Sequence, residues 1–280
     1  MPESTTPLDH QLDEHLEAVS QAFARKATVY DAFGEGHENL ARMRRRLYDH
    51  IQALVPPGAR LLELNAGTGL DAVRMVERGY RVHATDLSPG MVAQIQAKIR
   101  DHGLEGRLSA EQLSFTQLDR LDLAAHGPFQ GIYSNAGGLN CIQDLTLVTR
   151  QLPRLLVPGG VVTWVIMPRI CPWELLHLLQ DPRTATRRLR PGGVMAQVEG
   201  VRFHTRYFSA GQVRRAFGPR FRQAKLEALS LLTPTADNKA FAARHPRLFR
   251  WLVAWDERLS RWPLLRGWGD FFILSMEFLG

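Results

Sequence analysis

The sequence predicts an α/β fold with a mainly parallel sheet, and three stretches carry this prediction. Residues 61–64 form an apolar run that leads into a turn with two glycines, and apolar residues then recur at helical spacing from residue 70. Residues 80–86 are typical of a second strand, and this strand ends on an acid. Residues 161–166 are continuously apolar, as in a strand that is buried on both faces.

The bulk composition favours a soluble, globular protein. The chain has 280 residues, of which 45% are hydrophobic and 22% are charged. No apolar run reaches the length of about 18 residues that a membrane span needs, and residues 1–15 are polar without a signal core. We therefore expect a cytoplasmic protein. The two cysteines, Cys141 and Cys171, are expected to be free thiols.

The charge is unevenly distributed along the chain. The formal net charge is +7, made up of −4 in residues 1–150 and +11 in residues 151–280. A cationic half is typical of proteins that bind nucleic acid, an anionic membrane or an anionic substrate, and it also arises from a solvated face. Because no separate nucleic-acid-binding module is visible, we expect no nucleic-acid partner.

The turn after the first predicted strand carries the candidate binding chemistry. Residues 67–72 fit the glycine pattern of dinucleotide-binding turns, which is a weak signal alone. The acid Glu63 at the strand end would repel a pyrophosphate and suit a ligand with ammonium or sulfonium groups. Asp86 ends the second strand nineteen residues after Gly67, where an acid can accept hydrogen bonds from a ribose diol.

These residues resemble the class I S-adenosylmethionine-dependent methyltransferases. The family's first motif, acid-x-Gly-x-Gly-x-Gly, is present as residues 63–69 with Asn65 at the first glycine position. Asn tolerates positive φ better than other residues with a side chain, so the turn stays feasible. The resemblance covers about residues 20–170. It implies a Rossmann-like, doubly wound sheet of seven strands with an antiparallel last strand, Glu63 near the methionine end of the cofactor and Asp86 at its ribose.

The resemblance also implies the cofactor, S-adenosylmethionine, and a set of residues around it. Tyr30 is expected over the methionine end, and Phe115 beside the adenine, where the family's usual acid is replaced by Ser114. The predicted cofactor-binding residues are Tyr30, Glu63, Asn65, Ala66, Gly67, Gly69, Asp86, Leu87, Met91, Ser114, Phe115 and Asn135.

We expect one methyltransferase domain with insertions. Its predicted parts are N-terminal helices in 1–57, a cofactor-binding core in 58–167, a cap insertion in 168–210, and a C-terminal part in 211–280 with a helical insertion in 234–262. Within these parts the periodicity predicts helices over 11–29, 39–54 and 142–156 and a hairpin over 195–207. The arginines at 42, 44, 45 and 46 are interpreted first as an exposed helix face.

The two insertions are expected to cover the opening through which a substrate enters. They bring apolar residues together with arginines, which predicts an acceptor with an apolar portion and a carboxylate or phosphate. A solvated face and a dimer surface are the alternatives. The predicted substrate-binding residues are Asn140, Trp173, Arg183, Arg187, Arg188 and Arg190.

The function that these features predict is methyl transfer from S-adenosylmethionine to a small molecule. A base is needed only if the acceptor arrives protonated, and the weak candidates for it are His177, His204 and Glu174. No metal is expected. The loop at 134–141 lacks the Asp/Asn-Pro-Pro-aromatic run of amino methyltransferases of DNA.

Other functions stay open on the sequence alone. A non-catalytic protein that binds S-adenosylmethionine is one alternative, and an NAD(P)-dependent oxidoreductase is a weaker one because of Glu63. The apolar face of 248–259 is flanked by arginines, so peripheral contact with a membrane surface is an alternative to packing within the cap. The oligomeric state and the acceptor atom are not encoded in any motif.

Overall fold

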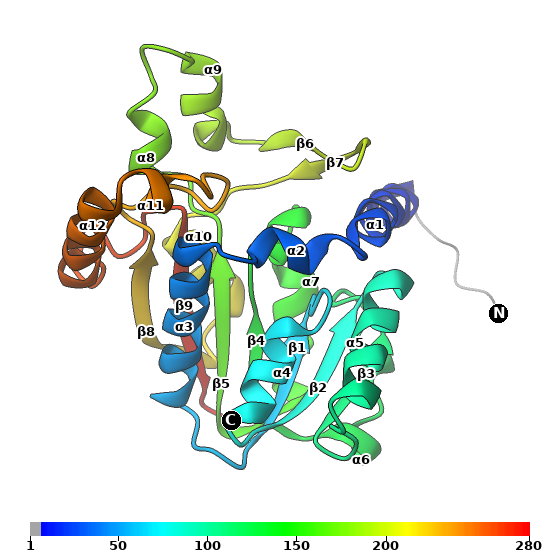
Figure 1. Cartoon of the computed structure of the whole chain (residues 1–280). Helices are drawn as coiled ribbons and strands as arrows, with labels where there is room; N and C mark the ends of the chain where they lie inside the picture. The colour runs from blue at the N-terminus through cyan, green and yellow to red at the C-terminus, as the bar shows by residue number, and fades with distance from the viewer. Residues whose placement is uncertain (1–6) are drawn as a thin grey trace.

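One twisted sheet organises the molecule (Figure 1). The computed structural model describes residues 7–280. Residues 1–6, which are part of the segment that led us to expect no secretion signal, lie outside that range. Within it the main sheet has seven strands in the order β3-β2-β1-β4-β5-β9-β8. These strands are β1 (Arg60–Leu64), β2 (Arg81–Asp86), β3 (Leu108–Gln112), β4 (Phe129–Ser134), β5 (Leu156–Ile166), β8 (Phe221–Leu229) and β9 (Phe271–Phe278).

The strand directions confirm the predicted fold class. Neighbouring strands from β3 to β5 pair in parallel, whereas β9 pairs antiparallel with both β5 and β8. Strand β1 lies between β2 and β4, so the chain order reverses beside it. Ligands of open α/β sheets bind at such a switch point, outside the carboxyl ends of the strands.

Helices cover both faces of the sheet. On one face, Leu47, Met75 and Ile95 pack in a buried cluster with the strands. On the other face, Trp164 and Phe217 pack in a second buried cluster, with ring centroids 4.5 Å apart. The helices of the first face are α3 (Glu38–Gln52), α4 (Leu70–Glu77) and α5 (Pro89–Asp101), and those of the second are α6 (Leu123–His126), α7 (Thr146–Thr149) and α10 (Ala210–Phe217).

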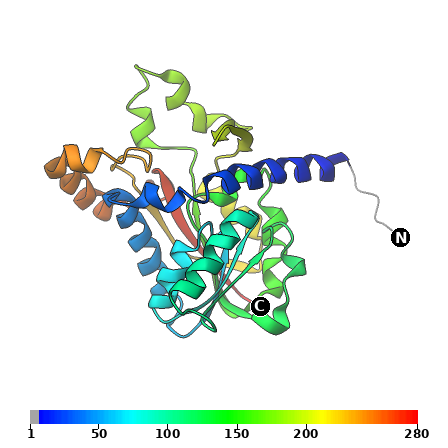
Figure 2. The ribbon, with the colours of Figure 1, turned by 45° about the vertical axis from the view of Figure 1, so that its right-hand side comes forward.

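A cap layer lies over the carboxyl ends of the parallel strands. Figure 2 shows α1 running across this end of the sheet, below the hairpin β6–β7. Phe23 of α1 and Phe203 of β7 pack with ring centroids 6.1 Å apart. The cap elements are α1 (Pro7–Lys26), α2 (Tyr30–Gly34), α8 (Pro172–Leu175), α9 (Pro182–Ala185), β6 (Val194–Val198), β7 (Val201–Thr205), α11 (Phe241–Arg244) and α12 (Pro246–Leu259).

Some predicted elements are confirmed and others need correction. The hairpin exists at β6–β7, and the helices predicted at 11–29 and 39–54 correspond to α1 and α3. The continuous helix predicted over 142–156 is wrong, because only α7 is α-helical there. The Asp144 side chain binds the backbone N–H of Thr146 at 2.9 Å, which starts the helix late, and Pro153 starts a separate 3₁₀ turn. The short 3₁₀ segments of the chain are η1 (Leu118–Arg120), η2 (Gly138–Cys141), η3 (Leu152–Arg154) and η4 (Arg187–Leu189).

The interpretation of the α3 arginines as an exposed face is also wrong. Arg42 is 8% exposed and forms an ion pair with Asp256 at 2.8 Å. Arg46 pairs with the buried Glu227 at 3.0 Å. Of the four arginines, Arg45 alone is exposed. The partners lie about 200 residues later in the chain, so the local pattern of α3 gave no sign of them.

Candidate functional site

The turn after β1 has a backbone conformation that opens it toward a ligand. Asn65, Gly67 and Gly69 have φ angles of 48°, 57° and 77°, in the left-handed region that glycine and asparagine adopt most readily. The Asn65 amide accepts a hydrogen bond from Ser134 Oγ at 2.6 Å and donates one to the carbonyl of Asn135 at 3.1 Å. Asn65 therefore adopts the predicted conformation and fixes the turn to the end of β4.

A cavity lies beside this turn. Its walls come from the turn after β1, the end of β2, the loop after β4 and the two N-terminal helices. Eight residues of the predicted cofactor set line it together: Tyr30, Asn65, Ala66, Gly67, Asp86, Leu87, Phe115 and Asn135.

Asp86 is held rigidly in the wall of this cavity. One carboxylate oxygen accepts the backbone N–H of Gly67 at 2.8 Å, and the other accepts that of Ser88 at 2.8 Å. Burial raises the pKa of Asp86 to about 6, although these two N–H groups oppose the shift. The carboxylate is thus ionised at neutral pH and titrates on mild acidification.

Four of the predicted cofactor residues do not line the cavity: Glu63, Gly69, Met91 and Ser114. Gly69 caps α4, and Ser114 forms a hydrogen bond with Thr116 at 2.8 Å. Met91 is fully buried. These residues can shape the cavity wall, but their side chains do not form its surface.

Glu63 lies in the sheet core beneath the turn. It is 1% exposed and accepts a hydrogen bond from the Tyr133 hydroxyl at 2.9 Å. Burial raises the pKa of Glu63 well above its ordinary value.

Two charged residues that the sequence reasoning did not select line the cavity. Asp71, in the first turn of α4, accepts hydrogen bonds from Asn135 Nδ2 at 2.8 Å and from the Tyr48 hydroxyl. The Nε atom of Arg44 lies 3.4 Å from Asp71, and this Nε has no hydrogen-bond partner among the described residues. Asp71 lies within the glycine pattern at residues 67–72, so the sequence could have pointed to it. Arg44 was missed because it was assigned to an exposed helix face.

The N-terminal helices close the cavity on the side opposite the sheet. Leu16, Val19 and Phe23 of α1 line it. Beside them, Asp31 of α2 accepts hydrogen bonds from Lys98 Nζ at 2.6 Å and from the hydroxyl of Thr68 in the turn. The cover is therefore attached directly to the turn and to α5.

A second cavity adjoins the first below the hairpin. The two share Tyr30, Arg44 and Asn135 in their walls. The second cavity is mainly apolar, and its cations are Lys26, Arg44 and Arg187. Its apolar lining includes Phe23, Phe33, Leu40, Met43, Val165, Met167, Val198, Phe203, Leu229 and Phe271.

Two joined cavities thus lie at the switch point of a doubly wound sheet. Residues 61–160 match the family described as "Methyltransferase domain". This match spans β1 to β5 and contains the turn, Asp86 and the loop after β4. Residues 61–160 therefore resemble a methyltransferase domain, and this supports the predicted class I S-adenosylmethionine-dependent type.

Individual relatives cover different shares of this chain. A malonyl-[acyl-carrier protein] O-methyltransferase of Serratia marcescens is 30% identical over 52% of this chain and 51% of its own. The chain spans about half the length of the first curated relatives that it matches. A 1,6-didemethyltoxoflavin-N1-methyltransferase of Burkholderia thailandensis, solved with S-adenosylhomocysteine, has the same fold, with a TM-score of 0.58, 14% identity and coverage of 100% of this chain and 93% of its own.

The methyltransferase fold also occurs in a solved protein with a different name. A [4+2]-cyclase shares it, with a TM-score of 0.54, 18% identity and coverage of 83% of this chain and 80% of its own. At such identities the likeness concerns the fold alone. The chemistry of this chain must therefore be argued from its own site.

The predicted substrate residues of the methyltransferase are dispersed by the structure. Arg187 lines the second cavity, whereas Arg183 and Arg190 are exposed on the cap. Asn140 is fully buried and binds backbone groups of Met167 and Arg206. Trp173 packs edge-on against Phe241 at 5.3 Å. Asn140 thus links η2 to the segments at Met167 and Arg206, whereas Trp173 packs within the cap, and neither side chain lines a cavity.

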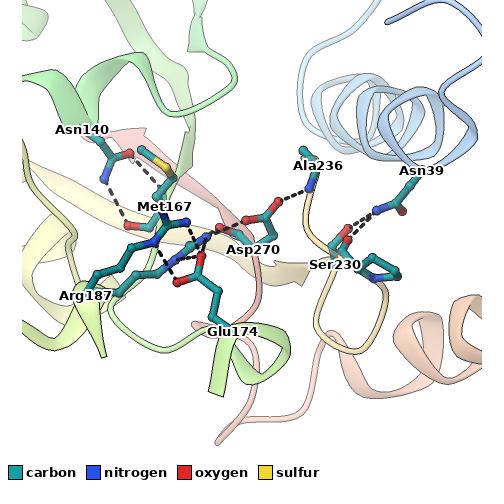
Figure 3. A network of polar contacts seen from close by, with 10 residues as sticks. Asn39, Asn140, Met167, Glu174, Arg187, Ser230, Ala236 and Asp270 are labelled. Atoms are coloured by element: carbon teal, nitrogen blue, oxygen red, sulfur yellow. Dashed lines mark hydrogen bonds and ion pairs between the residues drawn. The ribbon is translucent and has the colours of Figure 1, made fainter. Parts of the chain in front are cut away.

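Glu174 and Arg188 belong to a buried ion network (Figure 3). Glu174 binds Arg187 at 2.7 Å and Arg188 at 2.8 Å, and Arg188 also binds Asp270 at 2.7 Å. Burial alone would raise the pKa of Glu174, but the two guanidiniums lower it below its ordinary value. A carboxylate so engaged is a poor proton acceptor, and Arg188 has no donor directed at either cavity.

The two histidine candidates lie away from the cavities. His177 is exposed and bonds to Gln180 at 3.2 Å. His204, on the hairpin, bonds to Gln143 at 2.5 Å. Their catalytic role stays a prediction that the geometry does not favour. The described part of the chain contains no group of three or more His, Cys, Asp or Glu placed to hold a metal ion.

Two further findings concern the cysteines and the helices of the described chain. Cys141 and Cys171 are buried free thiols, as predicted. Among residues 7–280, the helices lack the length and apolar character that crossing a membrane requires.

Proposed function

We propose that this protein transfers the methyl group of S-adenosylmethionine to a small-molecule acceptor. The observation that carries the proposal is the junction of the two cavities, where Tyr30, Arg44 and Asn135 form part of both walls. A cofactor in the first cavity and an acceptor in the second would meet at this junction. Methyl transfer needs such an arrangement because the acceptor attacks in line with the bond that breaks.

In this proposal the first cavity binds the cofactor. Asp86 accepts hydrogen bonds from the ribose hydroxyls, and Leu87 and Phe115 contact the adenine. Arg44 is the one cation that lines this cavity in the described chain, and S-adenosylmethionine carries one carboxylate. We assign Arg44 to that carboxylate, since its Nε has no hydrogen-bond partner within residues 7–280.

The reaction is a displacement at carbon. The acceptor atom forms a bond to the methyl carbon while the bond between that carbon and sulfur breaks, and S-adenosylhomocysteine leaves as a neutral thioether. The cofactor supplies the reactivity, and the protein aligns the two partners and excludes water. The attachment of α2 to the turn through Asp31 supports this exclusion.

The second cavity favours an acceptor that has an apolar body and an anionic group. Lys26 and Arg187 are cations in a wall that is otherwise mainly apolar. No histidine within residues 7–280 lines it, and burial raises the pKa of both Tyr30 and Tyr207, so these tyrosines are poor bases. A carboxylate acceptor fits such a wall, because it enters already ionised and needs no proton removed.

The names of the relatives support the reaction class and not one acceptor. One relative is named for malonyl-[acyl-carrier protein], and a fold neighbour is named for 1,6-didemethyltoxoflavin. These acceptors differ in size and in the atom that receives the methyl group. We therefore propose a class of acceptor from the cavity rather than a compound from a name.

An assay with labelled cofactor tests the proposal. Purified protein is incubated with S-adenosylmethionine carrying a tritiated methyl group and with matched panels of apolar carboxylates, phenols and amines. We expect label in a carboxylate, as a base-labile ester. Stoichiometric cofactor binding without transfer to any panel member or to a metabolite extract would favour the non-catalytic alternative.

A further inference from the structure

Helix α12 has one face that is firmly held by the rest of the protein. Phe249 is 2% exposed and packs inward. The Asp256 carboxylate accepts hydrogen bonds from Arg42 at 2.8 Å, from the Thr233 hydroxyl at 2.7 Å and from the Leu232 N–H at 2.6 Å. These contacts fix the rotation of the helix, and so they fix which residues point outward.

The opposite face of α12 is rich in tryptophan and arginine. Trp251 is 56% exposed and Trp255 is 37% exposed, and their rings contact each other with centroids 6.1 Å apart. The guanidinium of Arg258 lies over the Trp255 ring at 5.4 Å. Helical spacing places Arg247 and Leu248 on the same face. We call this face, formed by Arg247, Leu248, Trp251, Trp255 and Arg258, the α12 ridge.

The segment after the helix extends this apolar surface. Trp262 is 58% exposed and Leu264 is 82% exposed. Figures 1 and 2 both place α12 at the periphery of the molecule, on the side of β8 and far from β3. Exposed tryptophans are uncommon on monomeric proteins, and several close together mark a surface that contacts something.

The charge of this region points to an anionic contact. Arg244, Arg247, Arg250 and Arg258 form no salt bridge within residues 7–280. Glu257 is the one exposed acid of α12. The region therefore combines large amphipathic rings with a net positive charge that is not balanced locally.

We propose that the α12 ridge docks on an anionic phospholipid surface, with the helix lying parallel to it. Tryptophan prefers the boundary between head groups and acyl chains, and arginine extends past it to reach phosphate. A helix with this division of faces lies in the interface without spanning it. The held inner face means that docking needs no unfolding of α12.

Co-flotation with vesicles tests this proposal. We expect the protein to float with vesicles of phosphatidylcholine and phosphatidylglycerol at low salt, and to stay behind with phosphatidylcholine alone. Replacing Arg247 and Arg258 together by Gln should lower the partition coefficient by about fivefold per arginine. Trp251→Ala with Trp255→Ala should lower it at least as much.

A matched control uses arginines on a different surface. Arg100→Gln with Arg107→Gln removes the same charge from exposed positions near α5 and should leave flotation nearly unchanged. Binding of S-adenosylhomocysteine reports folding in every variant and is expected to be constant, because α12 lines neither cavity.

Three outcomes would overturn the proposal. The first is no flotation with anionic vesicles at low salt. The second is an equal loss of flotation in the control and the ridge variants, which would indicate a general charge effect. The third is concentration-dependent dimerisation that the tryptophan substitutions abolish, which would assign the ridge to a second copy of this chain. None of these outcomes bears on methyl transfer, so the two proposals fail separately.

Discussion

The sheet core and the cap differ in how their arginines and acids are used. In the core, Asp86 and the turn at 65–68 lie within about twenty residues of one another and line one cavity. In the cap, Arg188 binds Glu174 and Asp270, and Asp270 lies 82 residues away. The core thus takes one wall of its site from neighbours in sequence, whereas the cap uses charged residues to hold distant segments together. A cluster of arginines in a cap is therefore not by itself an anion site.

The largest expected effect of a single substitution concerns the cap. Arg188→Ala should lower the free energy of unfolding by about 3–5 kcal/mol, because it leaves the buried Asp270 without its cation and leaves Glu174 with Arg187 alone. Urea denaturation measures the change. Arg183→Ala, in an exposed position of the same segment, is the control and should stay within about 0.5 kcal/mol of the wild type. Equal and small effects in both would show that the network does not hold the cap.

The next effect belongs to the core. Asp86→Ala should weaken binding of S-adenosylhomocysteine by about 1–3 kcal/mol, the scale of hydrogen bonds to a charged group. Calorimetry measures it, with Asp119→Ala as an exposed control. Because Asp86 also holds the N–H of Gly67, circular dichroism must show that the variant is folded. Unchanged affinity in a folded variant would refute the ribose assignment.

Acidification should weaken binding of S-adenosylhomocysteine by less than Asp86→Ala does. The pKa of Asp86 is raised to about 6 in the protein, so its carboxylate is ionised above that pH and protonated below it. The ionised form accepts hydrogen bonds from the ribose on both oxygens, so affinity should fall as the pH drops through about 6. We expect a loss of about tenfold between about pH 8 and about pH 5. Asp86→Asn should flatten the profile, and an equally steep profile in that variant would assign the titration to another group.

The smallest expected effect is a change in KM that distinguishes Arg187 from the exposed arginines of the cap. Once an acceptor is known, Arg187→Ala should raise its KM by roughly fivefold, about 1 kcal/mol, because Arg187 lines the second cavity but shares its charge with Glu174. Arg183→Ala and Arg190→Ala should leave KM unchanged, since both side chains are exposed on the cap. If Arg183 or Arg190 gave the larger change, the second cavity would not be the acceptor site.

The sequence was sufficient for the fold and for much of the first cavity. Strand, turn and helix at 61–76 form by local preferences, and the acid at 86 follows from the next strand of the same unit. The left-handed Asn65 is a property of one residue and its turn. Features of this kind depend on neighbours in sequence, and so they can be predicted from it.

The missed features depend on contacts between distant segments. Arg42 looks like a surface residue in its helix until Asp256 is brought beside it. The burial of Glu63, which raises its pKa, also depends on the surrounding strands. Arg44 was grouped with its neighbours although its side chain lies between the two cavities. The two arginine errors came from assigning a charge to solvent before the tertiary fold was known.

The central claim is that the first cavity binds S-adenosylmethionine, and one calorimetric comparison tests it most directly. The wild-type protein is titrated separately with S-adenosylhomocysteine and with NAD at neutral pH. We predict saturable binding of S-adenosylhomocysteine at one site per chain and no measurable heat with NAD. The carboxyl groups of Asp71 and Asp86 in the cavity wall disfavour a pyrophosphate there. Binding of NAD without binding of S-adenosylhomocysteine would contradict the account.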